Sequence, residues 1–310
     1  MQTNAACVKS NLGLVCITTS DAVRYTRTTR KKLLTLNEPD RAAALRKLYA
    51  ENAIRLERAV DFCLANDLRL YRISSDIFQF SDEPFGREVL NEFTQRLAGI
   101  GTRAIENGIR LVMHPDQFVV LSSDSEDVVA NSVKILGMHA NTLDMLGQPR
   151  SEWAATIIHG GKSDRPDRMV ESILRLPEAI RSRLVLENDE FSYSSDEILE
   201  VCRRAGVPMV FDAHHHVCHE KLDSFDHPSV AEFFWAARET WSDQGNQMVH
   251  ISNGRGHFND RAHSDLIEKM PEVYRHAPWI EVEAKHKEIA IEKLRREWLE
   301  GGTNASAVGK

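Results

Sequence analysis

The sequence of 310 residues lacks any apolar run long enough to cross a bilayer, and its N-terminus lacks a basic segment followed by an apolar core. It also lacks a Pro/Ser-rich linker, a low-complexity block and a repeat of solenoid length. These absences predict a cytoplasmic protein with no membrane partner. They also favour one domain over residues 1–310, with a disordered tail at 301–310.

Cysteine is scarce, and basic charge is not in excess. The five cysteines are an odd number without CxxC spacing, which argues against a disulfide framework and against a thiolate zinc site. A formal charge of −7 argues against a protein that coats nucleic acid through overall basicity. Residues 24–32 nevertheless gather basic side chains, among them Arg27, Arg30 and Lys31. This segment is either a solvated loop or one side of a basic groove on an acidic body.

Apolar runs that predict strands alternate with helix-period segments along the chain. The predicted strands cover residues 12–17, 68–74, 109–114, 155–159, 183–187, 207–212, 247–251 and 279–283. The predicted helices cover residues 40–66, 86–108, 127–146, 167–181, 195–205, 228–241, 262–276 and 287–299. This order predicts an α/β fold, a (β/α)8 TIM barrel whose active site lies at the carboxyl ends of the strands. A doubly wound sheet is the alternative, but no GxGxxG follows the first strand.

Six consecutive predicted strands end in side chains that can bind a metal ion. The stretch 207–216 is the clearest, because its apolar run passes directly into Asp212 and three histidines. Polar groups collected at a strand end need a cation or a hydrogen-bond network to offset their desolvation, so core histidines bonded to carbonyl groups are the alternative. The candidates are His114, His159, Glu187, Asp212, His215, His216, His250 and Glu283, with His263 shortly after the seventh strand.

The candidate ligands combine imidazole nitrogen with carboxylate oxygen and include no thiolate. That mixture suits Mn²⁺, Zn²⁺ or iron better than Ca²⁺. Because the set exceeds the needs of one ion, we infer a cluster of at least two, with Glu187 as a bridge. Paired ions stabilise in-line displacement at phosphorus and activate water, which predicts hydrolysis of a phosphate ester. A metal-dependent sugar isomerase or epimerase with a similar barrel remains the alternative, since barrel and ligands do not separate the two.

Several segments together resemble the UV damage endonuclease family. They are Tyr71-Arg72-Ile73-Ser74-Ser75, Met113-His114-Pro115-Asp116-Gln117-Phe118, Leu186-Glu187-Asn188-Asp189-Glu190, Asp212-Ala213-His214-His215-His216, Val249-His250-Ile251-Ser252 and Val282-Glu283-Ala284-Lys285-His286-Lys287-Glu288. The resemblance implies a TIM barrel similar to endonuclease IV. It also implies an enzyme that nicks double-stranded DNA immediately 5′ to UV photoproducts and some other lesions, leaving a 3′-hydroxyl and a 5′-phosphate. The implied cofactor is a cluster of two or three divalent ions, commonly Mn²⁺.

Position by position, the resemblance implies roles for individual residues. The implied metal ligands are His114, His159, Glu187, Asp212, His215, His250, His263 and Glu283. Glu187, His250 and Lys285 are implied to act in catalysis, and a lysine there suits a phosphate contact. Gln117 and Phe118 stand in place of a Gln-Tyr pair that resembles a wedge into the duplex. Beside such a substrate, Arg27, Arg30 and Lys31 would face the phosphate backbone.

Four positions depart from the pattern of the family. Leu14 and Thr18 stand where relatives have a tyrosine and an asparagine, which changes the pocket expected to bind the lesion. Glu83 replaces a histidine and could still bind a metal ion. Met248 replaces a lysine, and we expect a thioether there to weaken one metal position. For the whole chain we expect a monomer that binds damaged duplex and needs no nucleotide cofactor.

Overall fold

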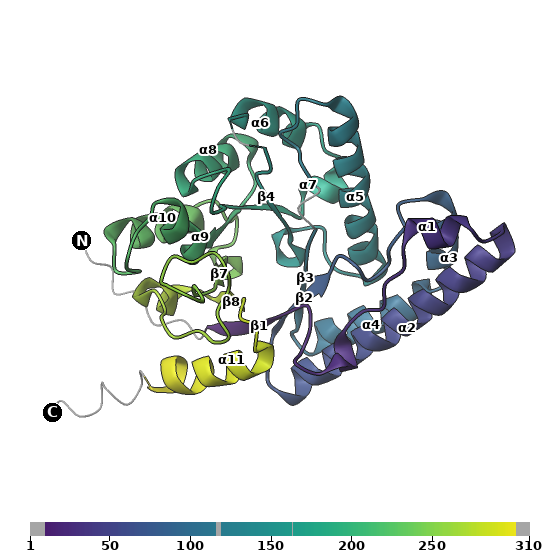
Figure 1. Ribbon diagram of the computed structural model, residues 1–310, viewed down its shortest axis with the longest axis horizontal. Helices are drawn as coiled ribbons and strands as arrows, with labels where there is room; N and C mark the ends of the chain where they lie inside the picture. The colour runs from purple at the N-terminus through teal and green to yellow at the C-terminus, as the bar shows by residue number, and fades with distance from the viewer. Residues whose placement is uncertain (1–9, 116–118, 163, 302–310) are drawn as a thin grey trace.

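The computed structural model describes residues 10–301 except 116–118 and 163. Its parallel strands form a closed barrel in sequence order (Figure 1). The strands are β1 (Asn11–Val15), β2 (Leu70–Ser74), β3 (Arg110–His114), β4 (Thr156–His159), β5 (Leu184–Glu187), β6 (Met209–Asp212), β7 (Met248–Ile251) and β8 (Trp279–Val282). The ring closes where β8 pairs with β1 in the register Leu12↔Ile280. The predicted TIM barrel is confirmed, and so are all eight predicted strands, with small shifts at their ends.

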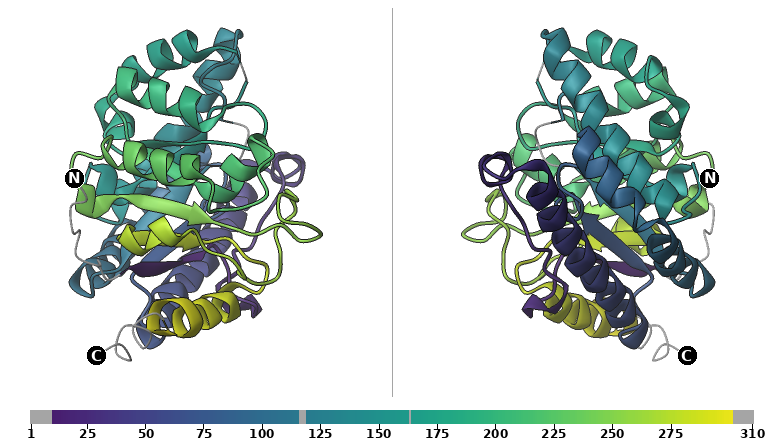
Figure 2. Two further views of the ribbon diagram at one scale, coloured as in Figure 1. Left: turned by 90° about the vertical axis from the view of Figure 1, so that its left-hand side faces the viewer. Right: turned by 90° about the vertical axis from the view of Figure 1, so that its right-hand side faces the viewer.

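Helices form an outer layer around the barrel, as the two side views in Figure 2 show. Their bounds are α1 (Arg30–Leu34), α2 (Glu38–Ala65), α3 (Pro84–Asn91), α4 (Thr94–Glu106), α5 (Glu126–Met145), α6 (Pro166–Leu174), α7 (Glu178–Arg181), α8 (Ser195–Ala205), α9 (Ala213–His219), α10 (Pro228–Arg238) and α11 (Lys287–Leu294). Short 3₁₀ turns lie at Asp21–Val23, Glu152–Ala154, Gln244–Asn246 and Glu272–His276, and a π-helical turn, Arg295–Glu300, follows α11. In the part of the chain described, no helix combines the length and apolarity of a membrane span.

Some helix predictions were wrong in extent. The segment 86–108 forms two helices, α3 and α4, and the segment 167–181 divides into α6 and α7. In the second case Pro177 stands between them, where it lacks an N–H group and disfavours helix at the preceding residue. The segment 262–276 forms only a short 3₁₀ turn at its end. There the Asn253 side chain accepts hydrogen bonds from the N–H groups of Glu268 and Lys269 (both 2.8 Å), so these donors are not available to a helix.

The amino end of the barrel is closed around a buried arginine. Arg110, the first residue of β3, donates to the carbonyl oxygens of Trp153 (2.7 Å), Asn246 (2.9 Å) and Glu152 (2.8 Å). Its guanidinium also lies 5.3–5.6 Å from the ring centroids of Trp153, Trp241 and Trp279. Such stacking suits a weakly hydrated planar cation. Burial lowers the pKa of Arg110 to about 9.

The middle of the barrel interior is apolar. Strand residues that include Leu70, Val112, Val185 and Val210 form one buried cluster there. Side chains alternate along a strand, so each of these residues shares its face with the polar residue two positions later. Met248 belongs to the same cluster, is fully buried and lies below His250. Met248 therefore packs the core. Our expectation that it weakens a metal position finds no contact to support it in the described residues.

Candidate metal centre at the carboxyl end of the barrel

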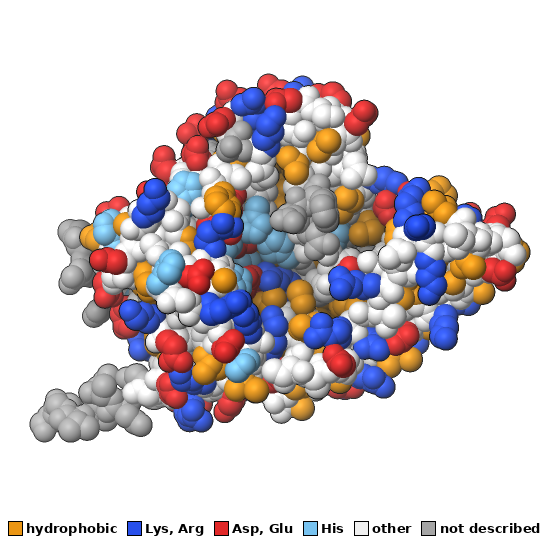
Figure 3. All heavy atoms as spheres, in the orientation of Figure 1, with side chains coloured by type: hydrophobic (Ala, Val, Ile, Leu, Met, Phe, Trp, Pro, Cys, Tyr) orange, Lys and Arg blue, Asp and Glu red, His pale blue; other side chains and the backbone are white. Residues whose placement is uncertain are grey.

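At the carboxyl ends of the strands lies a hollow of about 890 Å³, called the hollow below. Figure 3 shows histidine side chains gathered in a depression near the centre of that face, with lysine and arginine side chains around it. The predicted ligands that line the hollow are His114, His159, Glu187, His215, His263 and Glu283. For His114, His159 and Glu187 the alternation of strand side chains explains this grouping, because each follows a buried apolar strand residue by two positions.

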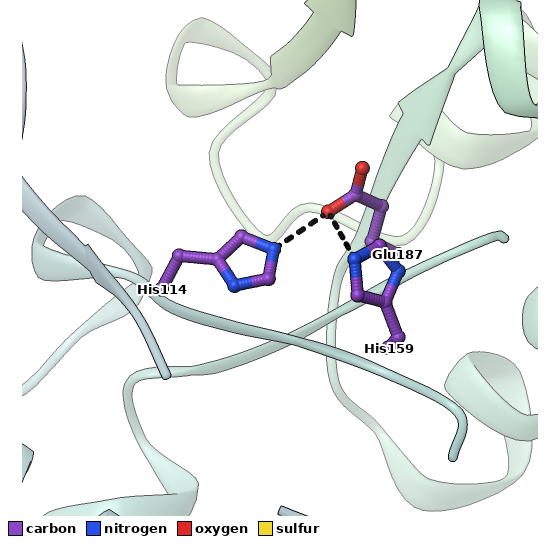
Figure 4. Close-up of side chains that lie close together, drawn as sticks. All are labelled: His114, His159 and Glu187. Carbon is purple, nitrogen blue, oxygen red and sulfur yellow. Dashed lines mark hydrogen bonds and ion pairs between the residues drawn. The ribbon is translucent and has the colours of Figure 1, made fainter. Parts of the chain in front are cut away.

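Glu187, the last residue of β5, lies at the centre of the cluster and is buried. One of its carboxylate oxygens lies 3.0 Å from Nε2 of His114 and 3.8 Å from Nε2 of His159, and Figure 4 shows both rings directed at that oxygen. Nδ1 of His114 donates to the carbonyl oxygen of Pro115 (3.0 Å), which orients Nε2 toward the carboxylate. The other oxygen of Glu187 lies 2.9 Å from Nδ1 of His250. A carboxylate with imidazoles at both oxygens has the arrangement of a bridging ligand.

His250 connects this cluster to a second group of charges on β8 and β2. Its Nε2 lies 2.7 Å from a carboxylate oxygen of Glu281, which is fully buried and precedes Glu283 by two residues on the same face of β8. The Arg72 guanidinium lies 3.0 Å from Glu281 and 2.6 Å from Glu283. Both nitrogens of His250 thus face carboxylates, and Arg72 supplies a fixed positive charge beside two acids.

Asp212 divides its two oxygens between helix α9 and the cluster. Oδ1 accepts hydrogen bonds from the N–H groups of His214 (2.7 Å) and His215 (2.8 Å) and so caps α9. Oδ2 is buried and has no hydrogen-bond partner among the described residues. Asn188 exchanges hydrogen bonds with the Asp212 backbone (2.9 Å each), and its carbonyl oxygen accepts from Nδ1 of His215 (2.9 Å). Nε2 of His215 is therefore directed toward Oδ2, at 3.9 Å.

These contacts fit a metal cluster. The described residues contain three groups of potential metal ligands, and within each group the ligand atoms lie within 4.8 Å of one another. The groups are His114 with His159 and Glu187, Glu187 with Asp212 and His215, and His250 with Glu281 and Glu283. Two of the groups share Glu187. Oδ2 of Asp212 and Nδ1 of His159 are buried without a hydrogen-bond partner in the described chain, and such groups are destabilising unless something binds them. The nitrogen and oxygen donors suit a transition metal such as Mn²⁺, Zn²⁺ or iron.

The pKa values show how the side chains of the cluster balance one another's charge. Burial alone would raise the pKa of Glu187, but the charges of His250 and His159 hold it well below its usual value. Burial alone would lower the pKa of His215, but Asp212, Glu187 and Glu190 raise it to about 9. The pKa of His250 is likewise raised by Glu187 and Glu281 against the effect of burial. Protons on these rings thus supply the positive charge that the acids require, and a bound cation would displace them.

Two further predicted ligands differ in their placement. His263 lines the hollow, and its Nδ1 lies 3.8 Å from Glu283. Glu83 does not join the cluster: its carboxylate is bound by Arg30 (2.5 Å) and Lys134 (3.4 Å), and it belongs to none of the three ligand groups found in the described residues. The hydrogen bond from Arg30 is the main cause that lowers the pKa of Glu83. The expectation that Glu83 binds a metal is therefore not supported.

The predicted DNA contacts also separate into groups. Leu14 and Thr18 are buried and do not line the hollow, so neither side chain offers a surface to a lesion. Lys285 is exposed just after β8 and is not among the lining residues described. The arginines of the basic segment are exposed but paired, Arg27 with Asp76 at 3.3 Å and Arg30 with Glu83; Lys31 is exposed. Gln117 and Phe118 lie outside the described residues.

Sequence reasoning missed the residues that hold the ligands in place. Arg72 and Glu281 interrupt the apolar strands Leu70–Ser74 and Trp279–Val282, and a charged residue inside a buried strand was the available signal. Asn188 follows Glu187 directly. Of the three consecutive histidines only His215 faces the cluster, because His214 contacts Ser252 (2.6 Å) and His216 is bound by two serines.

A model of the family described as UV-endonuclease UvdE matches residues 10–308 of the chain. A UV DNA damage endonuclease of Nostoc sp. is 56% identical over 292 residues, which cover 94% of this chain and 91% of the relative. A UV DNA damage endonuclease of Deinococcus radiodurans is 44% identical over 296 residues, covering 94% of this chain and 97% of the relative.

Two solved structures are informative. The crystal structure of SacUVDE matches with a TM-score of 0.78 and 27% identity and covers 93% of this chain and 98% of that one. A D-tagatose 3-epimerase-like protein matches with a TM-score of 0.57 and 13% identity, over 96% of this chain and 100% of that one. The second likeness extends to the fold alone, so it does not favour the sugar isomerase alternative.

Proposed function

The chain belongs to the UV-endonuclease UvdE family and is a UV damage endonuclease, and from that premise we propose how it cuts DNA. It nicks damaged duplex on the 5′ side of the lesion by hydrolysis of one phosphodiester bond, which leaves a 3′-hydroxyl and a 5′-phosphate. Glu187 carries this proposal, because both of its oxygens face histidines that come from other strands.

In this proposal the ligands are His114, His159, Glu187, Asp212, His215, His250, His263 and Glu283, holding two or three divalent ions, commonly Mn²⁺ in such sites. When bound, the ions supply Lewis acidity to the phosphate and lower the pKa of the attacking water. The charges of His250 and His159 hold the pKa of Glu187 well below its usual value, which favours its ionised form among the imidazoles. Lys285, exposed beside the rim, contacts a phosphate oxygen and stabilises the charge that develops there.

Several residues of the chain act by orienting these groups. Nε2 of His250 lies 2.7 Å from a carboxylate oxygen of Glu281, and this ion pair holds the ring so that Nδ1 faces Glu187. Carboxylates that bind the second nitrogen of a ligand histidine fix its tautomer and orientation. Arg72 forms ion pairs with both Glu281 and Glu283, and its positive charge reduces the repulsion between the two carboxylates. Glu187 and His250 thus act in the reaction, and Arg72 and Glu281 position them.

Gln117 and Phe118 are proposed to enter the duplex at the lesion, since they follow the predicted ligand His114 by only three and four positions in the sequence. An aromatic ring with an amide recovers part of the stacking lost when a damaged dinucleotide leaves the helix. Alanine at either position should lower affinity for damaged duplex and leave metal content unchanged. If Phe118→Ala lowered the melting temperature while lesion preference persisted, the residue would be a packing residue instead.

The cutting experiment uses a duplex that carries one photoproduct and is labelled on either strand. With Mn²⁺ we expect a single nick directly 5′ to the photoproduct, with a 3′ end that a polymerase extends and a 5′ end that a ligase joins. An undamaged duplex of the same sequence is the control. A nick 3′ to the lesion, or an end that resists extension, would contradict the proposed chemistry.

The basic segment is tested through salt. Replacement of Arg27, Arg30 and Lys31 by alanine should reduce the slope of log affinity against log salt by up to about three, because each phosphate contact contributes roughly 0.9 to that slope. The change in slope should be smaller than this upper value, because Arg27 and Arg30 already form ion pairs with acidic side chains. An unchanged slope would show that the segment is a solvated loop.

A further inference from the structure

One aromatic side chain at the rim of the hollow is exposed and belongs to none of the three ligand groups. Phe191 follows β5 by four residues and is 63% exposed, the highest value among the large hydrophobic residues described as exposed. It lines the hollow together with Glu190 and Ser192. A phenylalanine left in water is unfavourable by about 25 cal/mol for each Å² of apolar surface, so its exposure at this place needs a reason.

The backbone holds Phe191 in its exposed position. Oδ1 of Asp189 accepts hydrogen bonds from the N–H groups of Phe191 (2.7 Å), Ser192 and Tyr193 (3.4 Å). The buried Tyr193 in turn donates from its hydroxyl group to the carbonyl oxygen of Lys162 (2.7 Å). The turn is thus fixed at both ends, and the ring projects from a preorganised loop.

One face of the ring is already covered. The Arg261 guanidinium lies 3.2 Å from the ring centroid and forms an ion pair with Glu190 at 3.2 Å. The other oxygen of Glu190 lies 3.7 Å from Nε2 of His215. Contacts therefore run from the predicted ligand His215 through Glu190 to Arg261 and Phe191. We call Phe191 and Arg261 the rim pair.

The rim pair lies at the carboxyl end of the barrel, where both residues line the hollow. Phe191 belongs to the loop after β5, and Arg261 belongs to the loop after β7. Only β6 separates these two strands in the closed ring, so the pair joins two nearby loops on one side of the opening. A duplex whose lesion lies over the cluster would meet both loops.

We propose that the rim pair is a second lesion-recognition element, in which the open face of Phe191 stacks on a nucleobase displaced from the damaged duplex. Arg261 covers the opposite face, keeps the ring flat against the loop and adds its charge near the phosphate backbone. Every base has a π-face, so this contact tolerates any base sequence. The inference rests on the proposed cutting of damaged duplex and adds a residue that the family motifs did not indicate.

The test uses the full-length Mn²⁺-loaded protein and a duplex with one photoproduct, under single-turnover conditions with protein in excess. Phe191→Ala should raise the protein concentration for half-maximal rate about tenfold or more, while the limiting rate changes less than about twofold. Phe191→Trp should restore wild-type affinity. Phe191→Leu, which keeps apolar bulk without a ring, should resemble Phe191→Ala. Leu174→Ala, at a 50% exposed residue of α6 that does not line the hollow, is the matched control and should behave as wild type.

A double-mutant cycle tests the pair itself. Arg261→Ala should weaken binding about fivefold, and the double variant with Phe191→Ala should be weaker than wild type by less than the product of the two single effects. Wild-type affinity in Phe191→Ala, or equal affinity in Phe191→Leu and wild type, would overturn the proposal. A lower melting temperature with unchanged half-maximal concentration would also overturn it, since the ring would then only pack between two loops.

The experiment also separates this inference from the proposed function. If the wild-type protein nicks 5′ to the photoproduct and Phe191→Ala does so at the same concentration, only the rim pair is wrong. If the wild-type protein does not nick the damaged duplex 5′ to the photoproduct, the proposed function and the inference both fail.

Discussion

The two ends of the barrel each hold a buried arginine, and their surroundings differ. At the amino end Arg110 is bound by carbonyl oxygens and indole rings, and no carboxylate contacts it among the described ion pairs. At the carboxyl end Arg72 contacts the carboxylates of Glu281 and Glu283. Fixed carbonyl dipoles and ring faces surround the first cation, and burial still lowers its pKa. The second belongs to a cluster with more acids than it can neutralise.

The comparison shows how one barrel separates stability from chemistry. The amino end is filled by rings and apolar side chains, whereas the carboxyl end retains buried atoms such as Oδ2 of Asp212 without a hydrogen-bond partner in the described chain. The amino end of the barrel stabilises the fold, and the carboxyl end provides the active site, as is general for this architecture. Four substitutions test this division.

Arg110→Met should have the largest effect on stability, about 4 kcal/mol. It leaves three buried carbonyl oxygens without their donor, and each such group is destabilising by about 1–3 kcal/mol. Denaturant unfolding should show the same loss with EDTA and with Mn²⁺, because none of the three ligand groups found in the described residues lies at this end. A loss that Mn²⁺ reverses would break the comparison.

Arg72→Met should destabilise the metal-free protein by about 3 kcal/mol, since it leaves buried carboxylates without their partner. Here Mn²⁺ should restore part of the stability by supplying positive charge. Adding Glu281→Gln should restore part of it as well, because that change removes one of the uncompensated acids. Equal losses with EDTA and Mn²⁺ would mean that the two arginines play the same role.

Glu187→Gln should lower nicking about 100-fold or more and also lower metal content, because the amide cannot bridge two ions as a carboxylate does. The melting temperature in EDTA should fall little, since the amino end is untouched. Metal analysis by mass spectrometry is the direct measurement. If the wild-type protein retained one ion or fewer after reconstitution, the proposal of a cluster with two or three ions would be wrong.

Met248→Leu should have the smallest effect, below about 1.5 kcal/mol, because the volume is conserved in an apolar cluster. Metal content and metal preference should match the wild type. Loss of an ion in this variant would show that Met248 contributes to the metal site. The site would then extend into the apolar cluster that contains Met248.

The barrel and most of the cluster could be predicted because both depend on the local pattern of apolar and polar residues in the sequence. Eight apolar runs gave the strands, and a polar residue at the end of a run was bound to meet its neighbours, since parallel strands end at one edge. His114, His159 and Glu187 are cases where this rule was sufficient.

The remaining differences depend on contacts between distant residues. The acids that pair with Arg27 and Arg30 follow β2, about fifty residues later, so the charge of the basic segment could not be judged locally. Which of three consecutive histidines faces the cluster depends on the phase of α9, and the cap at Asp212 sets that phase. Whether Lys285 reaches the hollow depends on the path of a loop, and the pattern of apolar and polar residues does not predict that path.

The divided role of Asp212 gives the site a spectroscopic reporter. The amide protons of His214 and His215 are bound to Oδ1 of the same carboxylate whose Oδ2 faces the cluster. Electron density withdrawn from one oxygen weakens the acceptor strength of the other. With a diamagnetic ion such as Zn²⁺, the chemical shifts and exchange rates of these two amides should therefore follow the charge bound at the carboxylate, and they would allow its occupancy to be observed from the backbone, without substrate and without turnover.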